Sequence, residues 1–113
     1  VVRLANIDAP EKNQSGGSEA TVALRNLIRP SKYLTVKTLS KGRYGRAIAL
    51  IFVSDKEINR EMVVRGWAWV YDQYNSDPSL DALEASARRR KHGIWGSDMV
   101  AIPPWEWRRG NKL

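Results

Sequence analysis

Residues 1–11, with the sequence VVRLANIDAPE, join a predicted strand to a short acidic loop. The β-branched residues and rough alternation of Val1–Ile7 predict a strand. Pro10 ends that strand, because proline lacks the backbone N–H that a sheet ladder needs and fixes φ. Asp8 and Glu11 therefore lie just past a strand end, where loops commonly present catalytic side chains.

Two arginines accompany these carboxylates. Arg3 lies on the same strand as Asp8, and Arg46 closes the run Tyr44-Gly45-Arg46. An Asp and a Glu alone would be as typical of a solvated surface or a helix cap. Together with two arginines they could hold a metal, clamp a phosphate and activate a water. The odd spacing of Arg3 and Asp8 nominally puts them on opposite faces of a strand, so a bend or bulge must bring them together.

The chain after this loop continues with a helix and two strands. Apolar residues at helical spacing predict a helix that Ser18 caps and Pro30 stops. The alternation of Lys32–Leu39 and the apolar run within Tyr44–Val53 predict a hairpin with a basic tip. With Val1–Ile7 this makes three strands, which cannot close a barrel and leave one sheet edge unpaired. Pairing of that edge with a second copy, in a homodimer, is one hypothesis.

Two further helices are predicted in the second half of the chain. Glu57–Gly66 has the pattern of a short helix that ends at its glycine. Trp67–Tyr74 is aromatic and irregular. The last helix begins at Asp77-Pro78, as a cap followed by a first-turn proline, and Gly93 closes it. The tail, Met99–Leu113, carries two prolines and a cluster of tryptophan and arginine, without a predicted element.

Composition limits the classes of function. The 113 residues have the length of one domain, and we treat 1–113 as a single domain. The absence of cysteine excludes disulfides and thiolate metal sites, and a lone histidine argues against zinc. Apolar runs are too short for a transmembrane helix, so no membrane partner is expected. The net charge of +7 favours a nucleic-acid partner, although surface solubility explains it equally well.

Four short motifs follow one another along the chain. They are Arg-Leu-x-x-Ile-Asp-x-Pro-Glu at 3–11, Tyr-Gly-Arg at 44–46, Gly-x-Ala-x-Val-Tyr at 66–71 and Gly-Ile-Trp at 93–95. In this order they resemble the staphylococcal nuclease (thermonuclease) family over nearly the whole chain. The resemblance implies an α+β, mainly β fold, which is a five-stranded OB-fold barrel with three helices. The three predicted strands would be the last three of the barrel, and the first two would precede Val1.

The resemblance also implies calcium-dependent hydrolysis of phosphodiester bonds in DNA and RNA. In that scheme Asp8 and the backbone carbonyl of Ala9 are calcium ligands, in keeping with the oxygen ligands that calcium prefers. Glu11 orients or deprotonates the attacking water. Arg3 and Arg46 clamp the phosphate and stabilise the charge of the transition state. The family's other metal-binding aspartates would precede this chain, so we expect the chain by itself to be weakly active or inactive.

The aromatic residues leave two interpretations open. The resemblance implies that Tyr44, with Tyr71 or Tyr74, contacts the nucleotide. The five tryptophans could stack on bases, but packing in the core is the preferred interpretation. A non-catalytic OB-fold module that binds nucleic acid without cutting it is the alternative function. If a signal peptide preceded the chain, a secreted or periplasmic location in a bacterium would be favoured.

Overall fold

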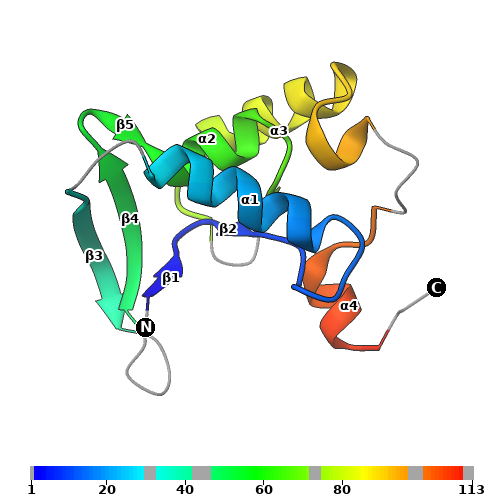
Figure 1. Ribbon diagram of the computed structural model, residues 1–113, viewed down its shortest axis with the longest axis horizontal. Helices are drawn as coiled ribbons and strands as arrows, with labels where there is room; N and C mark the ends of the chain where they lie inside the picture. The colour runs from blue at the N-terminus through cyan, green and yellow to red at the C-terminus, as the bar shows by residue number, and fades with distance from the viewer. Residues whose placement is uncertain (1, 30–32, 42–46, 72–74, 97–100, 111–113) are drawn as a thin grey trace.

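The structure, a computed structural model, describes residues 2–29, 33–41, 47–71, 75–96 and 101–110. The strands are β1 Val2–Leu4, β2 Ile7–Asp8, β3 Thr35–Lys41, β4 Ala47–Val53, β5 Lys56–Glu57 and β6 Trp69–Val70. The helices are α1 Gly17–Ile28, α2 Ile58–Val64, α3 Ser79–Arg89, the short 3-10 helix η2 Gly93–Trp95 and α4 Pro104–Arg108. In Figure 1 the β3–β4 hairpin lies at one end, α4 lies toward the other, and α1 crosses between them. The expected α+β class is confirmed.

The main sheet is built around β4. This strand pairs in parallel with β1 and antiparallel with β3, and its end pairs with β5. Ala49 and Ile51 of β4 are buried, as the apolar run of this strand predicts. The predicted hairpin is therefore confirmed. Among the described residues the strands form two separate sheets and do not close into a barrel.

A bend at Asn6 divides the first predicted strand into two. The expectation of one continuous strand over Val1–Ile7 is wrong, because Asn6 has φ of 69° in the left-handed region, which asparagine tolerates better than most residues. Its Oδ1 accepts hydrogen bonds from the Ser76 N–H at 3.0 Å and the Ser76 hydroxyl at 3.2 Å. After the bend, β2 leaves the main sheet and pairs antiparallel with β6, opposite Trp69 and Val70.

Neither β6 nor α4, both in the second half of the chain, was predicted. The segment expected to be irregular, Trp67–Tyr74, contains β6, a strand of 2 residues whose partner lies far away in the sequence. The tail contains α4, whose 5 residues are too few to show a helical period. Its Pro104 occupies the first helical turn, where a missing N–H costs nothing.

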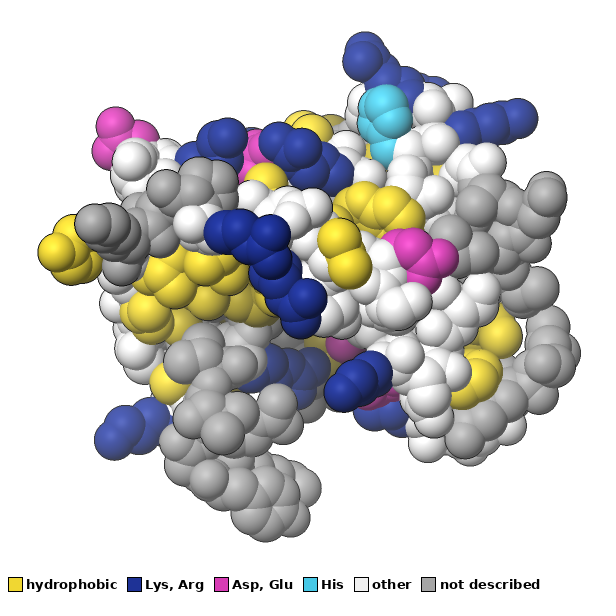
Figure 2. Space-filling model, in the orientation of Figure 1, with side chains coloured by type: hydrophobic (Ala, Val, Ile, Leu, Met, Phe, Trp, Pro, Cys, Tyr) yellow, Lys and Arg dark blue, Asp and Glu magenta, His cyan; other side chains and the backbone are white. Residues whose placement is uncertain are grey.

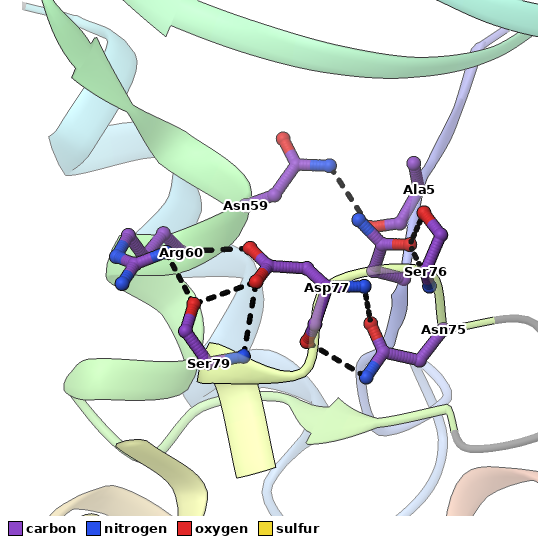
Figure 3. Close-up of polar contacts among 8 residues, drawn as sticks. Ala5, Asn59, Arg60, Asn75, Ser76, Asp77 and Ser79 are labelled. Carbon is purple, nitrogen blue, oxygen red and sulfur yellow. Dashed lines mark hydrogen bonds and ion pairs between the residues drawn. The ribbon is translucent and has the colours of Figure 1, made fainter. Parts of the chain in front are cut away.

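The helix boundaries agree only in part with the capping residues expected. Gly16, not Ser18, caps α1, and the Ser18 hydroxyl donates to Glu19 instead. At α3 the cap is Pro78, not Asp77, although the Asp77 carboxylate just before it accepts the Ser79 N–H at 3.1 Å (Figure 3). Hydrogen bonding from Ser79 lowers the pKa of Asp77. This helix ends at Arg89, earlier than Gly93.

The core lies between the helices and the β2–β6 pair. Its buried cluster is formed by Ile7, Ala20, Met62, Val63, Ala68, Val70 and Leu80. A fully buried polar residue, Asn59 of α2, connects this layer to the main sheet. Its side chain donates to the carbonyls of Ala5 (Figure 3) and Ala49 and accepts the Ile51 N–H. Because all these polar groups are paired, the burial of Asn59 fixes β1, β4 and α2 in one arrangement.

The hairpin end of the molecule exposes apolar side chains. Every residue of β3 is exposed, and Leu34, Val36 and Leu39 keep 42%, 46% and 45% of their surface accessible. Figure 2 shows hydrophobic side chains gathered on this side, with lysine and arginine side chains around them. Across the part of the chain that is described, none of the helices combines the length and apolar character needed to cross a membrane.

Candidate active site

A pocket of about 430 Å³ lies where β1, β2 and α4 meet. Its lining is Arg3, Leu4, Ile7, Asp8, Ala9, Glu11 and Arg108. The structure therefore brings together four of the residues expected from the sequence, namely Arg3, Asp8, Ala9 and Glu11. Arg46, Tyr44 and Tyr74 lie outside the described residues.

The bend at Asn6 explains how Arg3 and Asp8 reach the same pocket. Arg3 lies on β1, opposite Ile48 of the main sheet, whereas Asp8 lies on β2, opposite Trp69 of the second sheet. On a single flat strand their odd spacing would separate them. The left-handed backbone at Asn6 turns the chain between them, which is the bend that the sequence required.

Glu11 is held in place through its backbone. Its N–H donates to Oε1 of the buried Gln14 at 3.0 Å, and its carbonyl accepts the Gln14 N–H at 2.9 Å. The start of α1 then packs against the same peptide, since a Cβ on Gly17 would lie 1.9 Å from the Glu11 carbonyl oxygen. No side chain fits there, so glycine at this position allows the acidic loop to lie directly on the helix.

Arg108, at the end of α4, binds both carboxylates. Its Nη1 lies 2.6 Å from Glu11 Oε1 and 3.3 Å from Asp8 Oδ1, and its Nη2 donates to Asp8 Oδ2. The Asp8 side chain keeps only 12% of its surface accessible, against 38% for Glu11 and 41% for Arg108. Hydrogen bonding to Asp8, and then to Glu11, raises the pKa of the Arg108 guanidinium. This arginine is therefore a fixed positive charge between the two carboxylates.

Aromatic packing attaches α4 to the rest of the site. The Trp105 ring stacks on Tyr71, with centroids 5.1 Å apart, and meets Trp69 edge-on at 5.9 Å. Trp69 in turn packs against Trp95 at 4.4 Å. The guanidinium of Arg3 lies 5.2 Å from the centre of the Tyr71 ring. Trp69 is buried, as the packing interpretation predicts, whereas Trp95 and Trp105 pack against it half-buried.

Four residues of the site were missed by sequence reasoning. They are Asn6, Gln14, Trp105 and Arg108. The odd spacing of the charged residues was a signal for a bend, but it did not identify Asn6. Nothing local marks Gln14. The sequence showed the tryptophan and arginine cluster that contains Trp105 and Arg108. It did not show that Arg108 contacts Asp8 and Glu11, because these residues lie about 100 positions earlier in the chain.

The oxygen donors in the pocket fit a hard divalent cation. Asp8 and Glu11 offer carboxylates, and Ala9, whose backbone carbonyl is the other expected ligand, lines the same pocket. The described residues contain no group of three or more His, Cys, Asp or Glu that could hold a metal. This set therefore fits a cation held by one or two carboxylates, with water and substrate phosphate completing its shell.

Comparison with known proteins places these residues in a family. The family model described as "Staphylococcal nuclease homologue" matches residues 1–97. The chain belongs to the staphylococcal nuclease family. Family membership makes it a nuclease domain that is metal-dependent and has a nucleic-acid substrate. The motif at 3–11 supplies the acidic loop of the pocket, and the motif at 66–71 contains β6, which pairs with β2; α4 lies beyond the matched residues.

Three relatives illustrate the extent of the similarity. An "Uncharacterized endonuclease" of Escherichia coli is 44% identical over 108 residues, covering 95% of this chain and 69% of the relative. A protein of the same description from Haemophilus influenzae is 38% identical over 112 residues, covering 99% and 62%. A "Micrococcal nuclease" of Shigella flexneri is 38% identical over 123 residues, covering 98% and 69%.

Proposed function

We propose that this nuclease domain hydrolyses phosphodiester bonds of DNA and RNA with little sequence specificity, and that its metal is calcium. The observation that carries the proposal is the pocket shared by Arg3, Asp8 and Glu11. A guanidinium and two carboxylates in one pocket supply a phosphate-binding group, a metal ligand and a general base. Water attack does not use the 2′-hydroxyl of RNA, so the chemistry suits both kinds of nucleic acid.

The residues divide the chemistry among them. Asp8, with the carbonyl of Ala9, would hold the cation, which when bound polarises the phosphoryl oxygens and neutralises their charge. Glu11 accepts a hydrogen bond from the attacking water and takes its proton. Arg3 donates to the phosphate and stabilises the charge that grows on it, and Arg46 is proposed to do the same from its position before β4.

The choice of calcium rests on the donors. Carboxylate and carbonyl oxygens are hard ligands that favour calcium or magnesium over zinc or copper. Calcium also tolerates irregular geometry and a varying number of ligands, which suits a site that combines one carboxylate and one backbone carbonyl with water and phosphate.

The substrate contacts are proposed from charge and position. A chain with a net charge of +7 attracts the phosphate backbone whatever its sequence. Tyr71, which lies beside Arg3, is proposed to contact the nucleotide, together with Tyr44 and Tyr74. Since none of these contacts requires reading a base edge, cleavage is expected to show little sequence preference.

Cleavage of plasmid DNA, single-stranded DNA and RNA, with calcium or with chelator, tests the function. We expect this chain to show only weak calcium-dependent cleavage, and Glu11→Gln should lower that cleavage at least 100-fold, because a general base contributes about 10²–10⁴ in rate. Glu19→Gln is the matched control, since Glu19 is an exposed carboxylate on α1. If the wild type bound single-stranded DNA tightly but cleaved it no faster than the Glu11→Gln variant does, the non-catalytic binding module would be favoured instead.

A homodimer through the open sheet edge remains a prediction. The exposed β3, with Val36 46% accessible, is the edge on which a second copy could pair. Light scattering over a range of protein concentrations measures the association. A dimer that Val36→Lys dissociates would support the prediction, and a monomer at every concentration would contradict it.

A further inference from the structure

Arg108 binds the same oxygens that a metal would use. One guanidinium contacts both oxygens of Asp8 and Oε1 of Glu11. Bidentate contacts between a guanidinium and a carboxylate are among the stronger hydrogen-bonded ion pairs in proteins.

A divalent cation that binds these carboxylates beside the guanidinium of Arg108 is repelled by it, which weakens the binding of both. Both are positive, and both would lie within a few ångströms of the same oxygens, so they repel each other. Asp8 has only 12% of its side-chain surface accessible, which leaves little solvent to screen that repulsion. Arg108 itself is 41% accessible and lies at the last residue of α4, so it can turn outward without disturbing the core.

The rest of α4 keeps Arg108 close to the carboxylates even when it turns away. Trp105 precedes Arg108 by three positions, which puts both residues on one face of the helix. Trp105 stacks on Tyr71, and the Ile102 carbonyl just before the helix accepts a hydrogen bond from Gln14. These contacts hold the arginine at high effective concentration beside Asp8 and Glu11.

We propose that Arg108 is an internal counter-cation that a divalent metal must displace, so that α4 sets the metal affinity of the site. The inference rests on the proposed metal site at Asp8, beside the proposed base Glu11. In this proposal α4, which lies outside the family match at 1–97, controls when the site binds its metal. By linkage, a metal that binds at Asp8 must also weaken the contact of Arg108 with both carboxylates.

Calorimetric titration with calcium alone, without nucleic acid, measures this competition. Arg108→Gln keeps a polar side chain but removes the positive charge, and we expect it to bind calcium about tenfold more tightly than the wild type, within the usual range of coupling between two sites. Arg109→Gln is the matched control. Arg109 directly follows α4, and its replacement changes the net charge equally, but Arg109 pairs with Glu106 rather than with the site. Its affinity should stay within about twofold of the wild type.

A lysine variant separates charge from geometry. Arg108→Lys retains the charge as a single point and cannot make the bidentate contact, so its calcium affinity should fall between those of the wild type and Arg108→Gln. Equal affinity in Arg108→Gln and Arg109→Gln, weaker binding in Arg108→Gln, or no calcium binding by any variant would each overturn the inference.

Nuclear magnetic resonance of the arginine side chains provides a readout independent of affinity. The Nη–H signals of Arg108, slowed in rotation by its ion pairs, should be lost as calcium is added. Those of Arg88, which pairs with Glu84 at 3.3 Å and does not line the pocket, should stay. Persistence of the Arg108 signals at saturating calcium would refute displacement. Cleavage assays at saturating calcium test the proposed function separately from displacement of Arg108. If the wild type cleaves DNA while the Arg108 signals persist, the proposed function stands and only the displacement of Arg108 is refuted.

Discussion

The indole of Trp105 lies flat on the ring of Tyr71, with 4° between the two planes and 5.1 Å between their centroids. This stack joins the last helix to the residue that follows β6, and the ring of Tyr71 also lies near the guanidinium of Arg3. The position of α4 thus depends on an aromatic pair at the edge of the pocket.

Loss of that pair should detach α4. Trp105→Ala removes a half-buried indole and its stacking, and we expect it to lower the free energy of unfolding by about 2 kcal/mol. Urea unfolding followed by circular dichroism measures the change. Trp105→Phe keeps a ring to stack on Tyr71 and should recover at least half of the loss. A Trp105→Ala variant as stable as the wild type would show that α4 docks by other contacts.

Gln14 does not line the pocket, but it should affect catalysis because it positions Glu11. Gln14→Ala removes the acceptor for the Glu11 N–H and the donor to Ile102, so Glu11 is held less accurately. We expect cleavage to fall about tenfold, as small displacements of catalytic groups are costly. Asn13→Ala, at the exposed neighbouring position, is the control and should cleave at the wild-type rate. Equal rates in both variants would contradict a positioning role for Gln14.

Two substitutions at Asn6 separate its backbone role from its side-chain role. Asn6→Gly keeps access to the left-handed region but loses the acceptor for Ser76, which should cost about 1 kcal/mol of stability. Asn6→Ala loses both, and a further 1 kcal/mol or more is expected from forcing alanine to a positive φ. Chemical denaturation gives both values. If alanine were tolerated as well as glycine, the bend between Arg3 and Asp8 would not depend on this backbone conformation.

Glu57 predicts a pH dependence of stability. Burial raises the pKa of Glu57, an effect that Arg60 partly offsets and Asp77 reinforces, and its Oε2 has no hydrogen-bond partner among the described residues. When the folded pKa lies above the unfolded one, stability is highest at pH below the unfolded pKa. It is then lost as the pH rises through the folded value.

The neutral variant Glu57→Gln should avoid that loss. We expect its melting temperature to exceed that of the wild type by about 2 °C at pH 7 and to match it near pH 3.5. Glu61→Gln removes the carboxylate that pairs with Arg65 at 3.1 Å and should bring no gain at either pH. A destabilised Glu57→Gln at pH 7 would mean that the charged carboxylate is favourable where it lies.

The sequence predicted the parts of the fold that depend on neighbouring residues. The α1, α2 and α3 helices and the β3–β4 hairpin follow from periodicity and turn residues, which are local properties. The bend at Asn6 and the strand β6 were missed because they depend on partners elsewhere: Asn6 bonds to Ser76, and β6 exists only where β2 lies beside it. The boundary at Gly16 was missed because a glycine cap offers no side-chain signal.

The candidate site divides in the same way. Arg3, Asp8, Ala9 and Glu11 fall within one short motif, and the structure places them around one pocket. Arg108 approaches that pocket from the opposite end of the chain, through a helix too short to predict. Local pattern therefore identified the acidic side of the pocket, and only the tertiary structure identified the cation that neutralises it.

The hydrogen bonds between Arg108 and Asp8 span 100 positions of sequence. A ribosome that has made the acidic loop must add nearly the whole domain before the arginine exists. In refolding, a contact of this separation closes a long loop and forms late. A nascent chain therefore carries both carboxylates before it carries the guanidinium that pairs with them.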